Sequence, residues 1–186
     1  PNVYRLEPVV KVELAVADMD RNYYGDHALT IARHPSETDE RMMVRVLAFA
    51  LHADDALAFG RGLSADDEPD LWRRDLTGAI EQWIDVGLPD ERDVRKACGR
   101  AREVSVVAYG GRAVELWWAG ARAKLERQER LTVREVPLDA SRALARLAGR
   151  SMRLQVTIQD GHVHVTDGTS TIAIDLGVLK GPSGAR

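Results

Sequence analysis

The sequence predicts an α/β (α+β) protein in which helices flank a compact mixed β-sheet, and three observations support this prediction. Segments with helical spacing of apolar residues alternate along the chain with short runs rich in β-branched residues. The 186 residues contain no internal repeat and no low-complexity linker, so we expect residues 1–186 to form a single domain. Hydrophobic residues make up 45% and charged residues 30% of the chain, which is typical of a globular protein with its own core.

The first part of the chain is predicted to form a strand and then a short helix. The segment from Val9 to Ala17 alternates apolar and polar side chains, as a strand with one buried face does. A short helix is expected from Tyr24 to Ala32. Pro35 then breaks the chain, because proline has no backbone N–H and fixes its own φ angle.

The clearest predicted element is a helix from Glu37 to about Ala53. Ser36 stands at the N-cap position with Asp39 three residues further on, which is close to a capping box. The apolar stripe of this helix consists of Val44, Leu47 and Leu51. Stepping back along the stripe reaches Glu40 and then Glu37, at the end where the helix dipole stabilises an ionised carboxylate. We therefore expect an acid that lines a cavity; the alternative is a helix-start acid at the edge of the core.

The rest of the chain is predicted to alternate strands with helices and to end in a group of strands. The predicted strands are 57–63, 79–86, 104–108 and 131–136. The predicted helices are one that Asp90 caps and that buries a face between 94 and 101, a second over 114–125 and a third over 140–147. Residues 156–174 are expected to form strands that turn at Asp160-Gly161 and at Asp167-Gly168.

Acidic residues concentrate between Asp54 and Asp90, where ten carboxylates stand against three arginines. Carboxylates beside large apolar residues such as Trp72 and Trp83 are costly to bring together unless a positive group, often a metal ion, lies between them. The stretch is therefore a candidate site, and a solvated acidic loop is the alternative. Residues 91–130 carry ten positive and six negative charges, so an acidic focus beside a basic flank can hold metal ions next to phosphates.

Overall composition argues against several classes of protein. The formal net charge of −3 argues against a protein that coats nucleic acid through its total charge. Cys98 is the single cysteine, which excludes a fold supported by disulfides and a zinc–cysteine site. No run approaches the length of a membrane-spanning helix, and the first residues lack the apolar core of a signal peptide. We expect a cytoplasmic setting without membrane attachment.

Several motifs of the chain closely resemble those of the YaeQ family, and the match covers nearly the whole chain. The motifs are Ala32-Arg33-His34-Pro35-Ser36-Glu37-Thr38-Asp39-Glu40-Arg41-Met42, Phe59-Gly60-Arg61-Gly62-Leu63, Asp67-Glu68-Pro69 with Leu71-Trp72, Trp83-Ile84-Asp85-Val86-Gly87 with Pro89-Asp90, and Gln155-Val156-Thr157-Ile158-Gln159-Asp160-Gly161. The resemblance implies a variation on the PD-(D/E)XK, restriction-endonuclease-like core with extra strands. It therefore implies a nuclease-like acidic cavity, and it does not by itself imply cleavage.

The resemblance also implies roles for particular acids. Glu40, or in its place Glu37, resembles the helix carboxylate of that core. Asp67 and Glu68 resemble the acid at the second strand, and Asp85 resembles the D/E of the D/E-x-K step. These last three carboxylates are the implied ligands of an Mg²⁺ or Mn²⁺ ion.

The lysine of the D/E-x-K step is missing, because Gly87 stands at its position. Glycine offers neither a charge nor a proton, so it can neither stabilise a transition state nor activate water. Lys96, Arg61 and Arg41 are the candidates to replace the lysine in space. A competing register, Glu81-Gln82-Trp83, would put tryptophan in the lysine position and is ranked lower.

A second set of residues is a candidate surface for nucleic acid. Arg33, Ser36 and Arg41 lie at a predicted helix start, where backbone N–H groups can bind a phosphate. Arg61 adds a further guanidinium group, and Trp72 can stack on a base. A capped helix with solvated arginines explains the first group equally well, and tryptophans at the edge of a core more often serve packing.

Three functions follow as hypotheses. The first is an Mg²⁺- or Mn²⁺-dependent phosphodiesterase that acts on nucleic acid, which the convergent acids motivate. The second is a module that binds nucleic acid or nucleotides on a nuclease-like scaffold without the chemistry, which Gly87 motivates. The third is a protein-interaction module, which the modest net charge and several large aromatic residues motivate, although the sequence identifies no partner.

Overall fold

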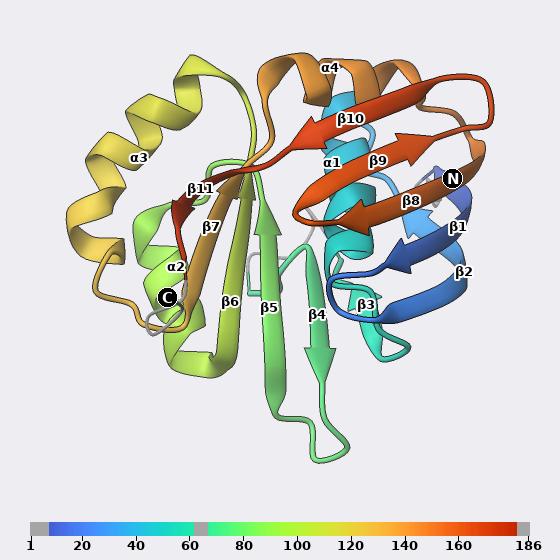
Figure 1. Cartoon of the computed structure of the whole chain (residues 1–186). Coiled ribbons are helices and arrows are strands. Elements are labelled where there is room, and N and C mark those ends of the chain that lie inside the picture. The colour runs from blue at the N-terminus through green and yellow to red at the C-terminus, as the bar shows by residue number, and fades with distance from the viewer. Residues whose placement is uncertain (1–7, 62–66, 182–186) are drawn as a thin grey trace, which may run out of the picture.

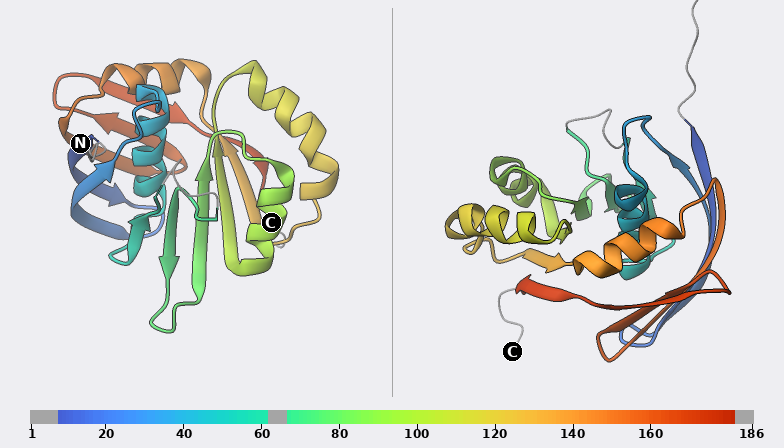
Figure 2. Two further views of the ribbon diagram at one scale, coloured as in Figure 1. Left: turned by 180° about the vertical axis from the view of Figure 1, so that it is seen from behind. Right: turned by 90° about the horizontal axis from the view of Figure 1, so that it is seen from above.

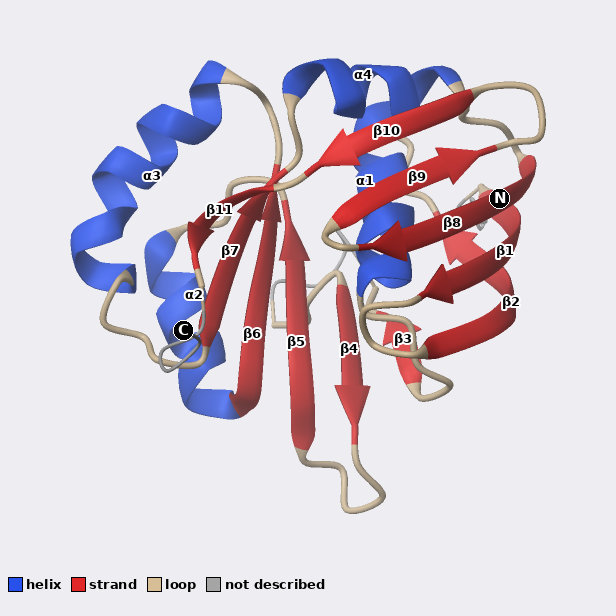
Figure 3. Ribbon diagram, in the orientation of Figure 1, coloured by secondary structure: helices blue, strands red, loops and turns tan. Residues whose placement is uncertain are grey.

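The computed structural model of the chain describes residues 8–61 and 67–181. Figure 1 shows the path of the chain, and Figure 3 distinguishes helices from strands. In chain order the elements are β1 (Val9–Asp18), β2 (Tyr23–Ala32), α1 (Asp39–Leu51), β3 (Leu57–Phe59), β4 (Leu71–Arg74), β5 (Ile80–Val86), α2 (Glu91–Arg100), β6 (Ala101–Ala108), α3 (Arg112–Leu125), β7 (Leu131–Glu135), α4 (Leu138–Arg146), β8 (Ser151–Gln159), β9 (His162–Thr166), β10 (Thr171–Asp175) and β11 (Gly177–Lys180). The α/β class predicted from the sequence is confirmed.

The strands form two mixed sheets rather than the one that the sequence predicts. One sheet has the order β10-β9-β8-β1-β2, with β1 and β8 parallel. The other has the order β11-β7-β6-β5-β4-β3, with β5, β6 and β7 parallel to one another. Each sheet brings together segments that lie far apart in the sequence, which the spacing of apolar residues along a single segment cannot indicate.

Helix α1 lies between the two sheets, as the view from above shows (Figure 2). Every residue of the helix from Met42 to Leu51 is buried, so the predicted single stripe is in fact an almost fully enclosed helix. One hydrophobic core joins α1 and α4 to the inner face of the five-stranded sheet and to residues of β5 and β6 such as Ile84 and Val107. A helix that is apolar on all sides is one that packs on all sides.

Helices α2 and α3 cover the opposite face of the six-stranded sheet (Figure 2). A second core forms there between Val94 of α2, Val114 of α3 and strand residues such as Val106. Side chains that alternate along β6 therefore enter the two different cores, as the two-residue period of a strand requires. Asp90 caps α2 as predicted, because its side chain accepts a hydrogen bond from the N–H of Arg92.

The short helix predicted from Tyr24 to Ala32 is wrong, because this segment is the strand β2. It pairs with β1 in antiparallel register over its full length, from Tyr23 opposite Asp18 to Ala32 opposite Val9. Residues 19–22 form the turn, in which Asn22 has a positive φ of 53°. The pairing partner, not the local sequence, selects the strand.

Other predicted bounds also change. The N-cap of α1 is Thr38 rather than Ser36, because the Thr38 hydroxyl accepts the N–H of Arg41 at 3.1 Å. The strand predicted over residues 57–63 ends at Phe59, and positions 62 and 63 lie outside the described residues. Strands β4 and β11 were not predicted at all. Within the described ranges, no helix has both the length and the apolar composition that crossing a membrane requires.

Candidate functional site

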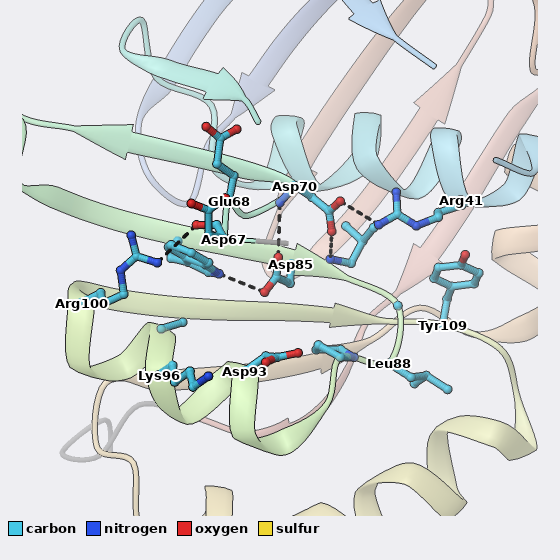
Figure 4. Close-up of a pocket in the computed structure, with 15 residues that line it drawn as sticks. Arg41, Asp67, Glu68, Asp70, Asp85, Leu88, Asp93, Lys96, Arg100 and Tyr109 are labelled. Atoms are coloured by element: carbon cyan, nitrogen blue, oxygen red, sulfur yellow. Dashed lines mark hydrogen bonds and ion pairs between the residues drawn. The ribbon is translucent and has the colours of Figure 1, made fainter. Parts of the chain in front are cut away.

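The candidate site is a pocket of about 650 Å³ where β5 and β6 end and α2 begins (Figure 4). Its lining residues are Arg41, Asp67, Glu68, Asp70, Trp83, Asp85, Val86, Gly87, Leu88, Pro89, Asp93, Lys96, Ala97, Arg100 and Tyr109. The carboxyl ends of parallel strands are where open α/β sheets usually bind their ligands. The pocket contains the acids predicted from the acidic stretch, together with basic residues from α1 and α2.

Two carboxylates, Asp70 and Asp85, lie side by side in this pocket because of the strand register. Leu71 of β4 pairs with Ile84 of β5 in an antiparallel ladder, so the residue before Leu71 comes to face the residue after Ile84. The backbone N–H of Asp70 donates to Oδ1 of Asp85 at 3.2 Å. The pairing thus places an acid from the start of β4 next to an acid near the end of β5.

The environment of Asp85 changes its acidity. Loss of hydration on burial, followed by the neighbouring charge of Asp70, raises the pKa of its carboxyl group to about 6. The indole Nε1 of Trp83 donates to Oδ2 of Asp85 at 2.9 Å, which acts in the opposite direction and limits the rise in pKa. Asp85 therefore titrates near neutral pH inside the pocket.

The carboxylate of Asp70 is occupied on both oxygens. Its Oδ1 accepts a hydrogen bond from Nη2 of Arg41 at 2.7 Å, and its Oδ2 accepts one from the backbone N–H of Val86 at 2.8 Å (Figure 4). The guanidinium group of Arg41 thereby neutralises Asp70 with a charge that belongs to the protein. This contact makes Arg41 the cation that pairs with Asp70.

Arg41 continues into a chain of buried charges, Asp70–Arg41–Glu37–Arg45, which we call the internal ion chain. Nη1 of Arg41 contacts Oε2 of Glu37 at 2.6 Å, while Arg45 contacts Oε1 of the same carboxylate. The side chains of Glu37 and Arg45 are 1% and 2% exposed, so these charges are held almost without water. Nε of Arg45 has no hydrogen-bond partner among the described residues.

The predicted metal ligands Asp67, Glu68 and Asp85 all line the pocket, but their carboxylates do not converge on one point. Glu68 accepts from the backbone N–H of Arg61 at 3.0 Å and pairs with the Arg61 guanidinium, which lowers the pKa of Glu68. Figure 4 shows the Glu68 carboxylate pointing away from Asp85. Asp67 is exposed, and it is its backbone oxygen that accepts from Arg100. Throughout the described residues, no group of three or more histidine, cysteine, aspartate or glutamate side chains could hold a metal ion, so the Mg²⁺ or Mn²⁺ site does not fit as predicted.

The other residues of the predicted catalytic set divide between the pocket and its surroundings. Glu40 lies outside the pocket, where its carboxylate accepts from the Ser141 hydroxyl of α4 at 3.2 Å. Lys96 lines the pocket from α2 and forms no ion pair with any described residue. Gly87 lies in the pocket with a φ of +91°, a conformation that a lysine would adopt only with strain, so the D/E-x-K pattern does not continue here.

Most of the predicted nucleic-acid surface lies outside the pocket. Arg33 pairs with Asp39 at 2.7 Å, and the backbone N–H of Ser36 donates to His34. Trp72 lies on β4 beneath the guanidinium group of Arg74, 4.3 Å from the ring centroid. The helix-start group is thus engaged within the protein. Of this predicted set, Arg41 lines the pocket directly, although it does so as the partner of Asp70 rather than as a free phosphate ligand.

Sequence reasoning missed two residues of the site, Asp70 and Arg100. Asp70 forms the dipeptide Pro69-Asp70 and stands fifteen positions before Asp85. That dipeptide, which spells the PD of the implied nuclease motif, was the signal that could have found it. Arg100 follows Lys96 by four residues on α2, and helical spacing places both on the pocket side of the helix.

These features define a class: a two-sheet α/β protein with an acidic and arginine-containing pocket at the carboxyl ends of parallel strands. The family model described as "YaeQ protein" matches residues 7–176, and the chain belongs to this family. The YaeQ protein of Salmonella typhi is 45% identical over 175 residues, which cover 94% of this chain and 97% of the relative. The YaeQ protein of Escherichia coli (strain K12) is 43% identical over the same length and coverage.

Solved structures of the family have the same fold. The crystal structure of the YaeQ protein from Xanthomonas axonopodis pv. citri superimposes with a TM-score of 0.92 at 53% identity, covering 95% of this chain and 99% of that one. The YaeQ protein from Pseudomonas syringae gives a TM-score of 0.91 at 37% identity, covering 97% and 99%. The family predicted from the sequence motifs is confirmed, while its relation to the PD-(D/E)XK core stays a prediction.

Proposed function

We propose that this YaeQ-family protein binds nucleic acid or nucleotides through phosphate contacts in the pocket and does not hydrolyse them. The observation that carries the proposal is the position of Arg41, whose guanidinium bridges Asp70 and Glu37. A metal-dependent phosphodiesterase needs carboxylate oxygens free to hold its ion. Here a protein cation already occupies the carboxylate that lies beside Asp85.

Two basic residues of α2 are placed to receive a phosphate. Lys96 forms no ion pair with any residue that the structure describes, and it lines the pocket. Arg100 donates one hydrogen bond to the backbone oxygen of Asp67 and lies over the ring of Trp83, 5.1 Å from its centroid. Since a guanidinium group has five N–H donors, Arg100 keeps donors for a phosphate oxygen.

The charges of the pocket limit how tightly an anion can bind. Arg41 pairs with Asp70 and Arg61 pairs with Glu68, while Asp85, with its pKa raised to about 6, loses its negative charge as the pH falls below 6. Asp67 and Asp93 then stand against Lys96 and Arg100. The ionised Asp85 leaves the balance slightly negative at pH 7, which supports weak, salt-sensitive binding, with dissociation constants of about 10⁻⁴ to 10⁻⁶ M as for non-specific nucleic-acid contacts.

Fluorescence anisotropy with a labelled single-stranded oligonucleotide tests the proposal. We expect binding at low salt that weakens as salt rises, and we expect Lys96→Ala to weaken it roughly uniformly across sequences and to lower the salt slope by about one. Lys124→Ala is the matched control, because Lys124 lies outside the pocket in an exposed pair with Glu91. Equal losses in the two variants would contradict the pocket assignment. No affinity even at low salt would favour the protein-interaction module instead.

A second candidate is the Mg²⁺- or Mn²⁺-dependent phosphodiesterase. The specific observation in its favour is that Asp70, Asp85 and Lys96 line one pocket, since Mg²⁺ is often held by one or two carboxylates together with substrate phosphates. Incubation of DNA and RNA with the protein and either ion separates the candidates. Asp39→Ala is the control, because it changes an exposed acid outside the pocket. Metal-dependent cleavage that is abolished in Asp85→Ala and retained in Asp39→Ala would establish hydrolysis and contradict the proposal that the protein binds without hydrolysis.

A further inference from the structure

Arg41 bridges two carboxylates with its guanidinium group. Its two terminal nitrogens bind carboxylates from two separate parts of the fold, Glu37 just before α1 and Asp70 just before β4. The side chain of Glu37 is 1% exposed and that of Asp70 is 8% exposed, so bulk water solvates neither carboxylate well. The side chain of Arg41 is 18% exposed and reaches the pocket surface (Figure 4).

We propose that Arg41 keeps divalent metal ions out of this pocket by occupying Asp70. The inference rests on the proposed function, since both assign the same pocket, but it concerns the metal and not the phosphate ligand. A divalent ion bound by Asp70 would have to displace a charge-assisted hydrogen bond of 2.7 Å and would then face the guanidinium at close range. Removal of Arg41 therefore should turn Asp70 and Asp85 into ligands for a metal ion.

The internal ion chain explains why the carboxylates would remain in place without Arg41. Glu37 keeps its contact with Arg45, whose buried Nε has no partner among the described residues and can take up the oxygen that Arg41 leaves. Asp70 keeps the backbone N–H of Val86 on Oδ2, and Asp85 keeps the indole of Trp83. Oδ1 of Asp70 is then free of Arg41, and the backbone N–H of Asp70 still donates to Oδ1 of Asp85, so the two acids remain neighbours.

The test compares Mn²⁺ binding by the wild-type protein and by Arg41→Met, a change that removes the charge but retains an unbranched side chain. Free Mn²⁺ is measured by electron paramagnetic resonance, and melting temperature is measured with and without MnCl₂. We expect the variant to bind Mn²⁺ at least about tenfold more tightly than the wild type, because a like charge near the ion is gone. Its melting temperature should rise with Mn²⁺.

Two variants control for charge and for surface effects. Arg41→Lys keeps a positive charge at the same place, so it should exclude Mn²⁺ as the wild type does. Arg92→Met removes an exposed arginine that pairs with Asp90 outside the pocket, and it should bind no more Mn²⁺ than the wild type.

Two double variants identify the carboxylate that binds the ion. Arg41→Met combined with Asp70→Asn should lose the gained Mn²⁺ binding, whereas Arg41→Met combined with Asp39→Asn should retain it.

Folding is checked by circular dichroism, and a further variant covers the case in which Arg41→Met does not fold. Arg41→Gln removes the charge, keeps a side-chain amide that can donate a hydrogen bond, and leaves the Glu37–Arg45 pair intact, so it should show the same gain. A folded variant with no gain, or wild-type protein that binds Mn²⁺ as tightly as the variant, would overturn the inference. Neither result depends on the oligonucleotide binding that Lys96→Ala tests, so the two proposals fail separately.

Discussion

At the scale of single residues, Asp85 shows how burial sets the chemistry of a carboxyl group. Its pKa is raised to about 6 in the folded protein by desolvation and by Asp70, against the ordinary 3.8 that we expect in the unfolded chain. A raised pKa means that folding favours the protonated form, so this contribution is present below about pH 4 and is lost as the pH rises through 6. Ionisation above pH 6 therefore destabilises the fold.

We expect Asp85→Asn to remove this pH dependence. Relative to the wild type, the variant should gain free energy of unfolding between pH 4 and pH 8, by on the order of 2–3 kcal/mol for a shift of about two pKa units. Urea denaturation at a series of pH values measures the change. The control is Asp93→Asn, an exposed acid at the pocket rim. A difference between Asp85→Asn and wild type that stays constant with pH would contradict the role of Asp85.

The internal ion chain gives a second prediction at this scale. Glu37→Gln removes the carboxylate between Arg41 and Arg45 and leaves a buried guanidinium without its counter-ion. We expect a loss of about 3–5 kcal/mol in the free energy of unfolding, as for other broken buried pairs. Asp39→Asn, two residues away, breaks an exposed pair with Arg33 and should cost less than about 1 kcal/mol. Equal effects in urea denaturation would show that burial does not decide the difference.

At the scale of elements, the start of α1 has Thr38 as its N-cap, where the sequence predicted Ser36. The hydroxyl of Thr38 accepts the N–H of Arg41, whereas the hydroxyl of Ser36 contacts only His34 in an exposed turn. Thr38→Ala should therefore cost about 1 kcal/mol of stability, and Ser36→Ala should cost much less. The midpoints of urea unfolding measure both changes, and a larger effect at Ser36 would restore the original prediction of the cap.

The end of β5 gives a prediction about two glycines. Gly87 has a φ of +91°, and a Cβ there would meet the Tyr109 ring at 3.8 Å, which is ordinary contact. Backbone strain alone should thus make Gly87→Ala destabilising, by about 1–2 kcal/mol. Gly99 lies within α2 with open space around it, so Gly99→Ala should be neutral or stabilising by up to about 1 kcal/mol. If both variants changed the melting temperature in the same direction, the assignment of backbone strain to Gly87 would be contradicted.

At the scale of the whole molecule, α1 connects the two sheets. Phe49 of α1 packs against His27 of β2 at a centroid distance of 5.0 Å and against Phe59 of β3 at 5.6 Å. These contacts belong to different sheets, so the sheets should unfold together if the chain is a single domain, as the sequence predicts. The four tryptophans lie on β4, β5 and α3, on the side of the six-stranded sheet, and report on that sheet alone.

We therefore expect Phe49→Ala to destabilise the whole protein by about 3–5 kcal/mol, because it removes a large buried side chain between the sheets. Tryptophan fluorescence and far-ultraviolet circular dichroism should shift by the same amount and stay coincident. Tryptophan fluorescence that keeps its wild-type midpoint while circular dichroism shifts would mean that the sheets unfold independently, which would contradict the single domain.

Local chemistry predicted some elements well and others poorly. The cap of α2 at Asp90 and the turn at Asp160-Gly161 depend on contacts within a few residues, and both are where the sequence places them. The strand β2 was mistaken for a helix because its partner β1 lies outside the segment itself. Contacts at long range override local preference wherever a segment gains its hydrogen bonds from a distant neighbour.

The sequence likewise predicted some residues of the candidate site and missed others. The acidic stretch and Asp85 were predicted, since clustered carboxylates beside tryptophan are visible in the sequence. Asp67, Glu68 and Asp85 line one pocket, but strand register makes Asp70 the direct neighbour of Asp85, and Glu68 pairs with Arg61. A shift of two residues in register is enough to exchange one acid for another.

The sequence by itself determined the family, the α/β class, the acidic stretch and the glycine where the implied motif has lysine. Tertiary structure decided which acids share a pocket and which cation neutralises them. The sequence did not indicate that Arg41 pairs with Asp70. Only the packing of α1 beside the start of β4 places its guanidinium on that carboxylate. The physical reason is that a buried charge is defined by its neighbours in space, and those neighbours come from residues that are far apart in the chain.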